Sequence, residues 1–334
     1  MNALPEDFFY SLKAIVDVIR RSPNVNERNI AFDDFVSKLD HVKRSSLNKT
    51  AESKVDLIVF TIIPKEQEAL ARVFQFDLAK EPQDINGIRF WKITFENFEN
   101  KAFSIVFARI GDVGNVSTAI ACTRFFRRFQ PELAVLVGIA AGLKGKVGMY
   151  STVCGTSVAS YEFQRLETKV VKPRPFIYNN NPLVNRYLRM ISDNIEGWKS
   201  MVKQKVDDLP SDSIDGENFY NDFYKNIDIN FGPIASGEKL FADGHSLKDL
   251  NKTITLEKGV IAADMESAGF CQACEEFQIP HIVLRGISDF GGVEKDKTKN
   301  KKNQIIAALS AGSTLREFLY YYYKPLKTIE NQVF

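Results

Sequence analysis

The chain has 334 residues, of which 44% are hydrophobic and 26% are charged, and its formal net charge is +2. This composition is typical of a soluble globular protein, and the near-neutral charge excludes a global attraction to nucleic acid or to an anionic membrane. Four cysteines are too few for a disulfide scaffold, and the longest apolar run is too short to span a bilayer. The N-terminus lacks the basic region of a secretory signal, so we expect a cytoplasmic protein.

The first 44 residues predict a helical appendage. Phe8, Leu12, Ile15 and Ile19 recur at helical spacing, and a second apolar segment follows a Ser-Pro break. Two short helices bury little surface alone, so we expect them to serve in assembly or in binding a partner. The polar tract at 45–54 is expected to be a linker.

From Val55 onward, apolar strands alternate with helices, which predicts an α/β domain over 55–325. We expect a mixed, largely buried central sheet flanked by helices. Its clearest elements are buried strands at 55–63 and 133–137, an antiparallel pair at 88–95 and 103–110, and helices at 65–74, 115–129 and 304–323. Residues 162–230 are the least readable part, with a helix expected around 183–201, and we expect them to form an insertion on the domain surface.

The stretch from 262 to 292 concentrates polar side chains at the ends of predicted elements. A helix begins near Met265 and Glu266, and we expect the helix dipole to keep Glu266 ionised. Ligands of α/β proteins collect beyond the carboxyl ends of strands. The apolar strand that follows delivers Arg285, Ser288 and Asp289 to such an end. Two carboxylates are therefore expected to flank one small polar ligand.

Two glycine-containing segments also follow predicted strands. Residues 138–143 form a small-residue turn whose amides would approach a ligand closely, but they lack the G-x-G-x-x-G spacing of a dinucleotide site. The segment from Arg109 to Asn115 precedes a helix, so it is either an anion site or a solvated loop. Asp112 argues against a bare phosphate at its own side chain.

Two further patterns have ordinary explanations. Cys271 and Cys274 lie on the apolar face of a helix without a second ligand pair, which favours core packing over a zinc or redox site. The lysine run at 294–302 is either a solvated loop or a lid on an anionic ligand, and the basic cluster at 169–174 offers the same alternatives.

These segments together resemble the purine nucleoside phosphorylase/methylthioadenosine nucleosidase superfamily. The most specific matches are ADMESA at 263–268, similar to the family's "EMEA" helix start, and RGISD at 285–289, similar to its "RxISD" strand end. Supporting matches lie at 64–66, 138–143 and 236–238. The resemblance implies a nucleoside phosphorylase-like fold and a purine nucleoside or nucleotide ligand, without a cofactor or a metal.

The resemblance also implies roles for individual residues. Asp289 would protonate N7 of the purine, Glu266 and Met265 would contact the ribose, and Glu66 would position or deprotonate the attacking water. Glu68 is the alternative to Glu66. Further expected substrate contacts are Leu240 and Phe241 at the base, together with Ser288, Arg285, Gly142 and Arg109.

Departures from the family pattern favour a hydrolase. Where family phosphorylases carry "GDPxR" and a serine in "RxGSxG", this chain has residues 61–66 (TIIPKE) and Asp112, which removes phosphate ligands. Ile139 replaces a serine of the nucleosidase glycine turn, which leaves the positioning of water open.

The lysine run suggests a 5′ phosphate chain, as in AMP or ATP. Superfamily nucleosidases that consume ATP occur in antiphage defence, where an appendage would suit recruitment. Methylthioadenosine/adenosylhomocysteine hydrolysis, phosphorolysis and a non-catalytic nucleotide sensor stay open, and a homo-oligomer is expected.

Overall fold

The computed structural model describes residues 54–167, 170–210, 223, 225–241, 243, 245–254, 259–292 and 297–323. The predicted helical appendage at 1–44 and nearly all of the predicted linker lie outside these residues. No helix within the described ranges combines the length and the hydrophobicity that crossing a membrane requires.

Ten strands of the described chain form one mixed sheet, in the order β11-β10-β6-β12-β5-β1-β4-β3-β2 with β9 beside β6. The strands are β1 (Leu57–Thr61), β2 (Gln83–Ile85), β3 (Ile88–Glu96), β4 (Ala102–Arg109), β5 (Leu133–Gly142), β6 (Thr152–Ser160), β9 (Phe176–Asn179), β10 (Ile229–Ser236), β11 (Ala262–Asp264) and β12 (His281–Asp289). Because β11 also pairs with the end of β5, one half of the sheet closes on itself.

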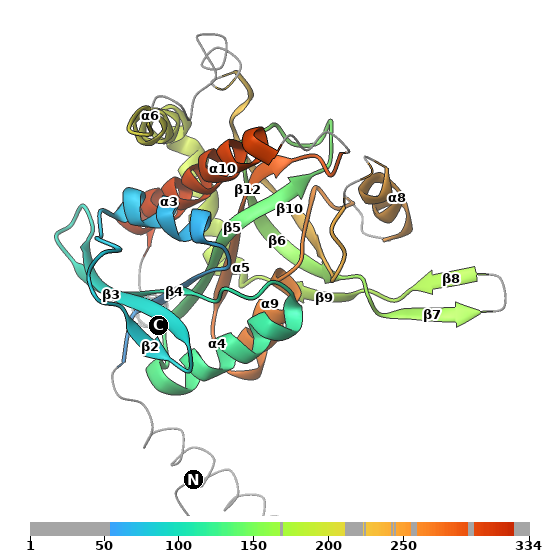
Figure 1. Ribbon diagram of the computed structural model, residues 1–334, viewed down its shortest axis with the longest axis horizontal. Coiled ribbons are helices and arrows are strands. Elements are labelled where there is room, and N and C mark those ends of the chain that lie inside the picture. Colours follow the sequence, from blue (N-terminus) through green and yellow to red (C-terminus); the bar gives the residue numbers. More distant parts are fainter. Residues whose placement is uncertain are drawn as a thin grey trace, which may run out of the picture. The chain divides into compact units, whose positions relative to one another are not determined.

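Helices cover both faces of this sheet (Figure 1). One face carries α3 (Pro64–Phe74), α5 (Pro182–Arg189), α6 (Ile195–Asp207) and α10 (Lys297–Glu317), and the other carries α4 (Asn115–Phe129) and α9 (Ser267–Glu276). Alternate side chains of β1 enter the two cores, with Leu57 on one side and Ile58 on the other. The predicted mixed and largely buried sheet flanked by helices is confirmed.

Shorter elements complete the described chain. The helix α8 (Ser246–Thr253) follows β10, and the short helices η1 (Met190–Asn194) and η3 (Phe318–Tyr322) adjoin α5 and α10. The strands β7 (Gln164–Glu167) and β8 (Val170–Pro173) form a separate antiparallel hairpin that projects from the body of the domain (Figure 1).

The segment at 162–230 is not simply a surface insertion, contrary to our expectation. Trp198 of α6 is fully buried, and its Nε1 donates a hydrogen bond to Thr314 Oγ1 of α10 at 3.0 Å. The stripe of Trp198, Val202 and Val206 packs into the main core. The helix expected around 183–201 corresponds to α5 and the first part of α6. Its burial was not predicted because charged residues surround this narrow apolar stripe.

Two predicted loops belong to regular elements instead. Residues 138–142 continue β5 rather than forming a turn, with Gly138 opposite Arg285 of β12. Their small side chains leave room for larger groups from neighbouring elements, as the site below illustrates. The lysine run is helical from Lys297 onward because α10 begins there, about two turns earlier than we predicted.

The cysteines behave as predicted. Cys271 and Cys274 are free, fully buried members of the core between α4 and α9. Burial raises the pKa of both thiols, so neither has the thiolate character that a metal or redox site needs.

Candidate active site

A cavity of about 420 Å³ lies at the carboxyl ends of β1, β5, β11 and β12. Pockets of this size suit a small-molecule ligand. Its wall combines four carboxylates with apolar side chains. The carboxylates are Glu66, Asp264, Glu266 and Asp289, and the apolar side chains include Ile62, Ile139, Leu240, Phe241 and Met265.

Glu66 is fixed by three backbone amides. Its Oε2 accepts hydrogen bonds from the N–H groups of Ile62 at 2.7 Å and Ile63 at 3.0 Å, and its Oε1 accepts one from Ile139 at 2.9 Å. Burial nevertheless raises the pKa of Glu66, against the lowering effects of Arg285 and these amides. The result is a rigid carboxylate that is more basic than an exposed glutamate.

Glu68, the alternative to Glu66, lies outside the cavity. Its carboxylate pairs with Lys65 at 3.1 Å and with Arg72 at 3.3 Å on α3. Of the two glutamates in this helix, the cavity contains Glu66.

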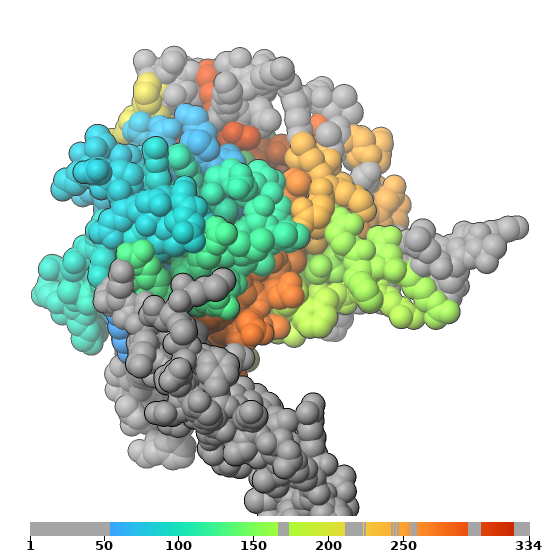
Figure 2. Space-filling model, turned by 60° about the horizontal axis from the view of Figure 1, so that its bottom comes forward, coloured from blue at the N-terminus to red at the C-terminus, as the bar shows by residue number. Residues whose placement is uncertain are grey.

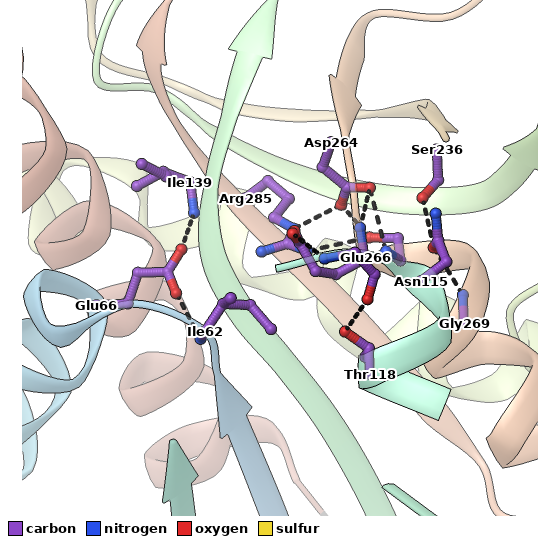
Figure 3. A network of polar contacts seen from close by, with 12 residues as sticks. Ile62, Glu66, Asn115, Thr118, Ile139, Ser236, Asp264, Glu266, Gly269 and Arg285 are labelled. Atoms are coloured by element: carbon purple, nitrogen blue, oxygen red, sulfur yellow. Dashed lines mark hydrogen bonds and ion pairs between the residues drawn. The ribbon is translucent and has the colours of Figure 1, made fainter. Parts of the chain in front are cut away.

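Arg285 forms ion pairs with two of these carboxylates, Asp264 and Glu266 (Figure 3). Its fully buried side chain donates from Nε to Asp264 Oδ2 at 2.7 Å and from Nη2 to Glu266 Oε2 at 3.4 Å. Asp264 also accepts hydrogen bonds from the backbone N–H groups of Glu266 and Ser267 and from the Ser267 hydroxyl. Asp264 therefore satisfies the N-terminal amides of α9, and Arg285 balances its charge.

Contrary to our expectation, the helix dipole does not hold the pKa of Glu266 in the ordinary range of a carboxylate. Burial raises the pKa of Glu266 to about 7, and the negative charges of Asp264 and Glu66 add to the effect. Arg285 and the Gly114 N–H, which donates to Glu266 Oε1 at 3.3 Å, only partly oppose it. Desolvation outweighs the dipole because the carboxylate is almost completely enclosed.

Gly138 brings the two halves of this network together. A Cβ at this position would overlap both Arg285 Nη1 and Glu66 Oε1. Only glycine leaves room for these two side chains to approach each other across β5. This close approach explains why Arg285 acts electrostatically on Glu66 as well as on Glu266.

Asp289 occupies the end of β12 on the cavity wall. Its Oδ1 accepts a hydrogen bond from Gly291 N–H at 2.8 Å, and its Oδ2 accepts one from Ser288 Oγ at 3.1 Å. These contacts orient the carboxyl group and leave it at the cavity surface, where a ligand can reach it.

The N-terminus of α4, which we had considered as an anion site, already contacts carboxylates of the protein. The Asn115 N–H donates to Glu238 Oε1 at 3.0 Å, next to the Gly114 N–H that donates to Glu266. The Asn115 side chain accepts hydrogen bonds from Gly269 N–H at 2.8 Å and Ser236 Oγ at 3.1 Å. These contacts tie the start of α4 to α9 and β10 (Figure 3).

Most of the predicted site residues meet in the cavity. Seven of them line it: Glu66, Leu240, Phe241, Met265, Glu266, Ser288 and Asp289. Three do not. Arg285 lies behind the carboxylates, Arg109 ends β4 away from the lining, and a Cβ added to Gly142 would meet Val147 and Ile287 rather than the cavity.

Several lining residues were not predicted from the sequence. Asp264 adjoins the Met265-Glu266 pair, and Lys239 lies between two predicted contacts, so adjacency was an available signal. Gln304 was expected at the start of the last helix, but nothing in the sequence indicated that it faces a cavity.

Residues 56–319 match the model of the phosphorylase superfamily. The chain belongs to this family. It is 29% identical over 270 residues to the ATP nucleosidase Cap17 of Escherichia coli, in an alignment that covers 79% of this chain and 50% of the relative. The chain thus spans about half the length of this curated relative. It is also 24% identical over 226 residues to the 5′-methylthioadenosine/S-adenosylhomocysteine nucleosidase of Tolumonas auensis, covering 64% of this chain and 85% of that protein.

Solved structures share the fold of this superfamily member. The 5′-methylthioadenosine/S-adenosylhomocysteine nucleosidase of Helicobacter pylori superposes with a TM-score of 0.59 at 16% identity, covering 80% of this chain and 98% of that one. The futalosine hydrolase of the same organism gives a TM-score of 0.58 at 16% identity, covering 79% and 97%.

Proposed function

We propose that this superfamily member hydrolyses the N-glycosidic bond of an adenine nucleotide such as ATP or AMP and releases the free base. The observation that carries the proposal is the gathering of Glu66, Glu266 and Asp289 around one cavity, with Glu66 held by three backbone amides. The similarity to an ATP nucleosidase supports the choice of substrate.

Each carboxyl group has a distinct task in this reaction. Asp289 donates a proton to N7 of the purine, so the base leaves with the electron pair of the broken bond. Glu66 orients water and takes its proton as the water oxygen bonds to C1′ of the ribose. Glu266 accepts hydrogen bonds from the ribose hydroxyls. The carboxylates also stabilise the positive charge that develops on the sugar.

Water is favoured over phosphate as the nucleophile. A phosphate at the N-terminus of α4 would meet the carboxylates of Glu238 and Glu266, which already accept from its first amides. Asp112 adds a further negative charge in the same loop. Repulsion between these carboxylates and a phosphate anion disfavours phosphate as the nucleophile.

Methylthioadenosine is the second candidate substrate. The apolar side chains of Ile62, Ile63, Val113 and Leu240 line the cavity beside its four carboxylates. An uncharged nucleoside with an apolar 5′ group suits such a wall. The relatives named for methylthioadenosine point the same way.

The deciding experiment measures adenine released from ATP, AMP, adenosine and methylthioadenosine, with and without inorganic phosphate. Phosphate-independent release from ATP or AMP is the expected result. Turnover of methylthioadenosine alone would contradict the nucleotide assignment, and ribose 1-phosphate formation would indicate a phosphorylase. Tight binding without release by the native protein would indicate a sensor.

We further infer that a second copy of the chain covers the face formed by α4 and α9 (Figure 2). A groove of about 900 Å³ lies there, and Val116 and Phe176 on its wall are 70% and 56% exposed. Glu275 and Glu276 also line it, while Arg165 and Arg174 lie exposed on the adjacent hairpin segment. A two-fold pairing would bring these opposite charges together.

Sedimentation analysis tests this assembly. We expect a dimer that Val116→Glu converts to a monomer, whereas a native monomer would contradict the inference. The prediction that residues 1–44 bind a partner stays a separate hypothesis.

A further inference from the structure

Lys239 differs in charge from the other ionisable residues of the cavity wall. Among the cavity-lining residues that the structure describes, it is the single cation, and it shares the wall with four carboxylates. A nucleotide brings additional negative charge to this wall. Its phosphate chain therefore needs a cation at the cavity that is free to turn toward it.

The Lys239 ammonium is held loosely between two neighbours. Its Nζ lies 3.4 Å from Glu162 Oε2 and 5.6 Å from the centroid of the Tyr161 ring. In the single chain the side chains of Lys239 and Glu162 are 59% and 37% exposed, and Glu162 also lines the groove that we assign to the second copy. Half-exposed ion pairs of this kind contribute little to stability, so Lys239 can change partners at small cost.

The cation behind the carboxylates lacks this freedom. Arg285 is fully buried and bonded to Asp264 at 2.7 Å, so its charge stays committed to the protein. Separating that pair would leave an uncompensated charge in the core. Of the cations that the structure describes at this site, Lys239 is therefore the one that can move to contact a ligand.

We propose that Lys239 determines specificity for the phosphate chain of the substrate, and that Glu162 competes with the phosphate for its ammonium group. This inference rests on the proposed nucleosidase function and names the residue that distinguishes nucleotides from nucleosides. When a nucleotide binds, the ammonium exchanges the Glu162 carboxylate for a phosphate oxygen. No covalent bond changes in this step.

The pair predicts effects of opposite sign. Lys239→Met keeps most of the aliphatic stem and removes the charge, so it weakens nucleotide binding. Glu162→Gln removes the competing charge and frees the lysine, so it strengthens nucleotide binding. The glutamine oxygen can still accept the hydrogen bond that Glu162 Oε1 receives from Glu238 N–H at 3.0 Å, so the loop keeps this contact.

The test compares AMP, ATP and adenosine in two assays: KM for adenine release, and calorimetric binding to proteins that also carry Asp289→Asn. We expect Lys239→Met to weaken AMP and ATP about tenfold, as loss of one charge-assisted contact predicts, and to leave adenosine unchanged. Glu162→Gln should tighten AMP and ATP about threefold. In the double variant, Glu162→Gln should have no further effect because it acts through Lys239.

Lys252→Met is the matched control, because Lys252 is an exposed lysine paired with Asp249 at 2.8 Å outside the cavity lining. Equal effects of Lys239→Met on adenosine and AMP, or no effect on either, would overturn the inference. Absence of adenine release from every substrate would instead reject the proposed function. The binding assay would still decide whether Lys239 discriminates AMP from adenosine.

Discussion

Replacing Glu266 with glutamine should remove a large pH dependence from the stability of the protein. In the folded chain, burial and the neighbouring carboxylates raise the pKa of Glu266 to about 7, from an ordinary value of 4.5. Between these two values the unfolded chain has released the proton that the folded chain still holds. Stability from this group is therefore fully present below about pH 4.5 and is lost as the pH rises through about 7.

The size of the effect follows from the two pKa values. Each tenfold change in a proton equilibrium is worth about 1.4 kcal/mol, so the difference between the two pKa values corresponds to at most about 3–4 kcal/mol. Glutamine resembles the protonated side chain, so the variant and the native protein should be close in stability at acidic pH.

Urea unfolding of both proteins at several pH values between about 5 and 8.5 measures the effect. The free energy of unfolding of E266Q should gain about 1–3 kcal/mol relative to the native protein across this range. The test is whether the free energy of unfolding changes with pH at different slopes in the two proteins. A difference in stability that is the same at every pH would report only the altered contact with Arg285. Parallel stability curves would refute the assigned protonation state. The stabilised variant should also lose activity, because glutamine is a poorer acceptor for ribose hydroxyls.

Three other substitutions test separate parts of the site. Asp289→Asn should lower kcat for adenine release about 10²- to 10⁴-fold while AMP binding by calorimetry stays similar, and nearly full activity would exclude Asp289 as the acid. Glu66→Gln should lower kcat by a comparable factor with little change in KM, because the amide cannot take a proton from water; a change in KM alone would contradict this role. Gly138→Ala should lower stability by about 1–3 kcal/mol in urea unfolding, since its Cβ would overlap Arg285 and Glu66; an unchanged midpoint would show that the network adapts.

Local patterns were sufficient to predict much of the fold. The helix expected at 115–129 coincides with α4, and the antiparallel pair expected at 88–95 and 103–110 corresponds to β3 and β4. These elements were readable because their apolar residues recur with the period of the element. The same logic brought Glu266 and Asp289 to strand and helix ends that meet at one cavity.

Contacts between distant segments could not be predicted from such patterns. Asp264 enters the cavity because β11 pairs with both β10 and β5, and this closure has no local signature. Lys239 meets Glu162 across 77 positions of sequence. The ionisation of Glu266 depends on the balance of burial, Arg285 and two other carboxylates, so its helix position alone gave the wrong answer.

The start of α4 connects the fold to the choice of nucleophile. A helix N-terminus preceded by glycines attracts anions, and here the first amides already donate hydrogen bonds to the carboxyl groups of Glu238 and Glu266. The same contacts hold Glu266 beside Arg285 and Glu66 at the cavity. A phosphate bound at these amides would have to displace the carboxylate that we assign to the ribose. The arrangement that organises the sugar site therefore also disfavours phosphorolysis, and water is the nucleophile consistent with both.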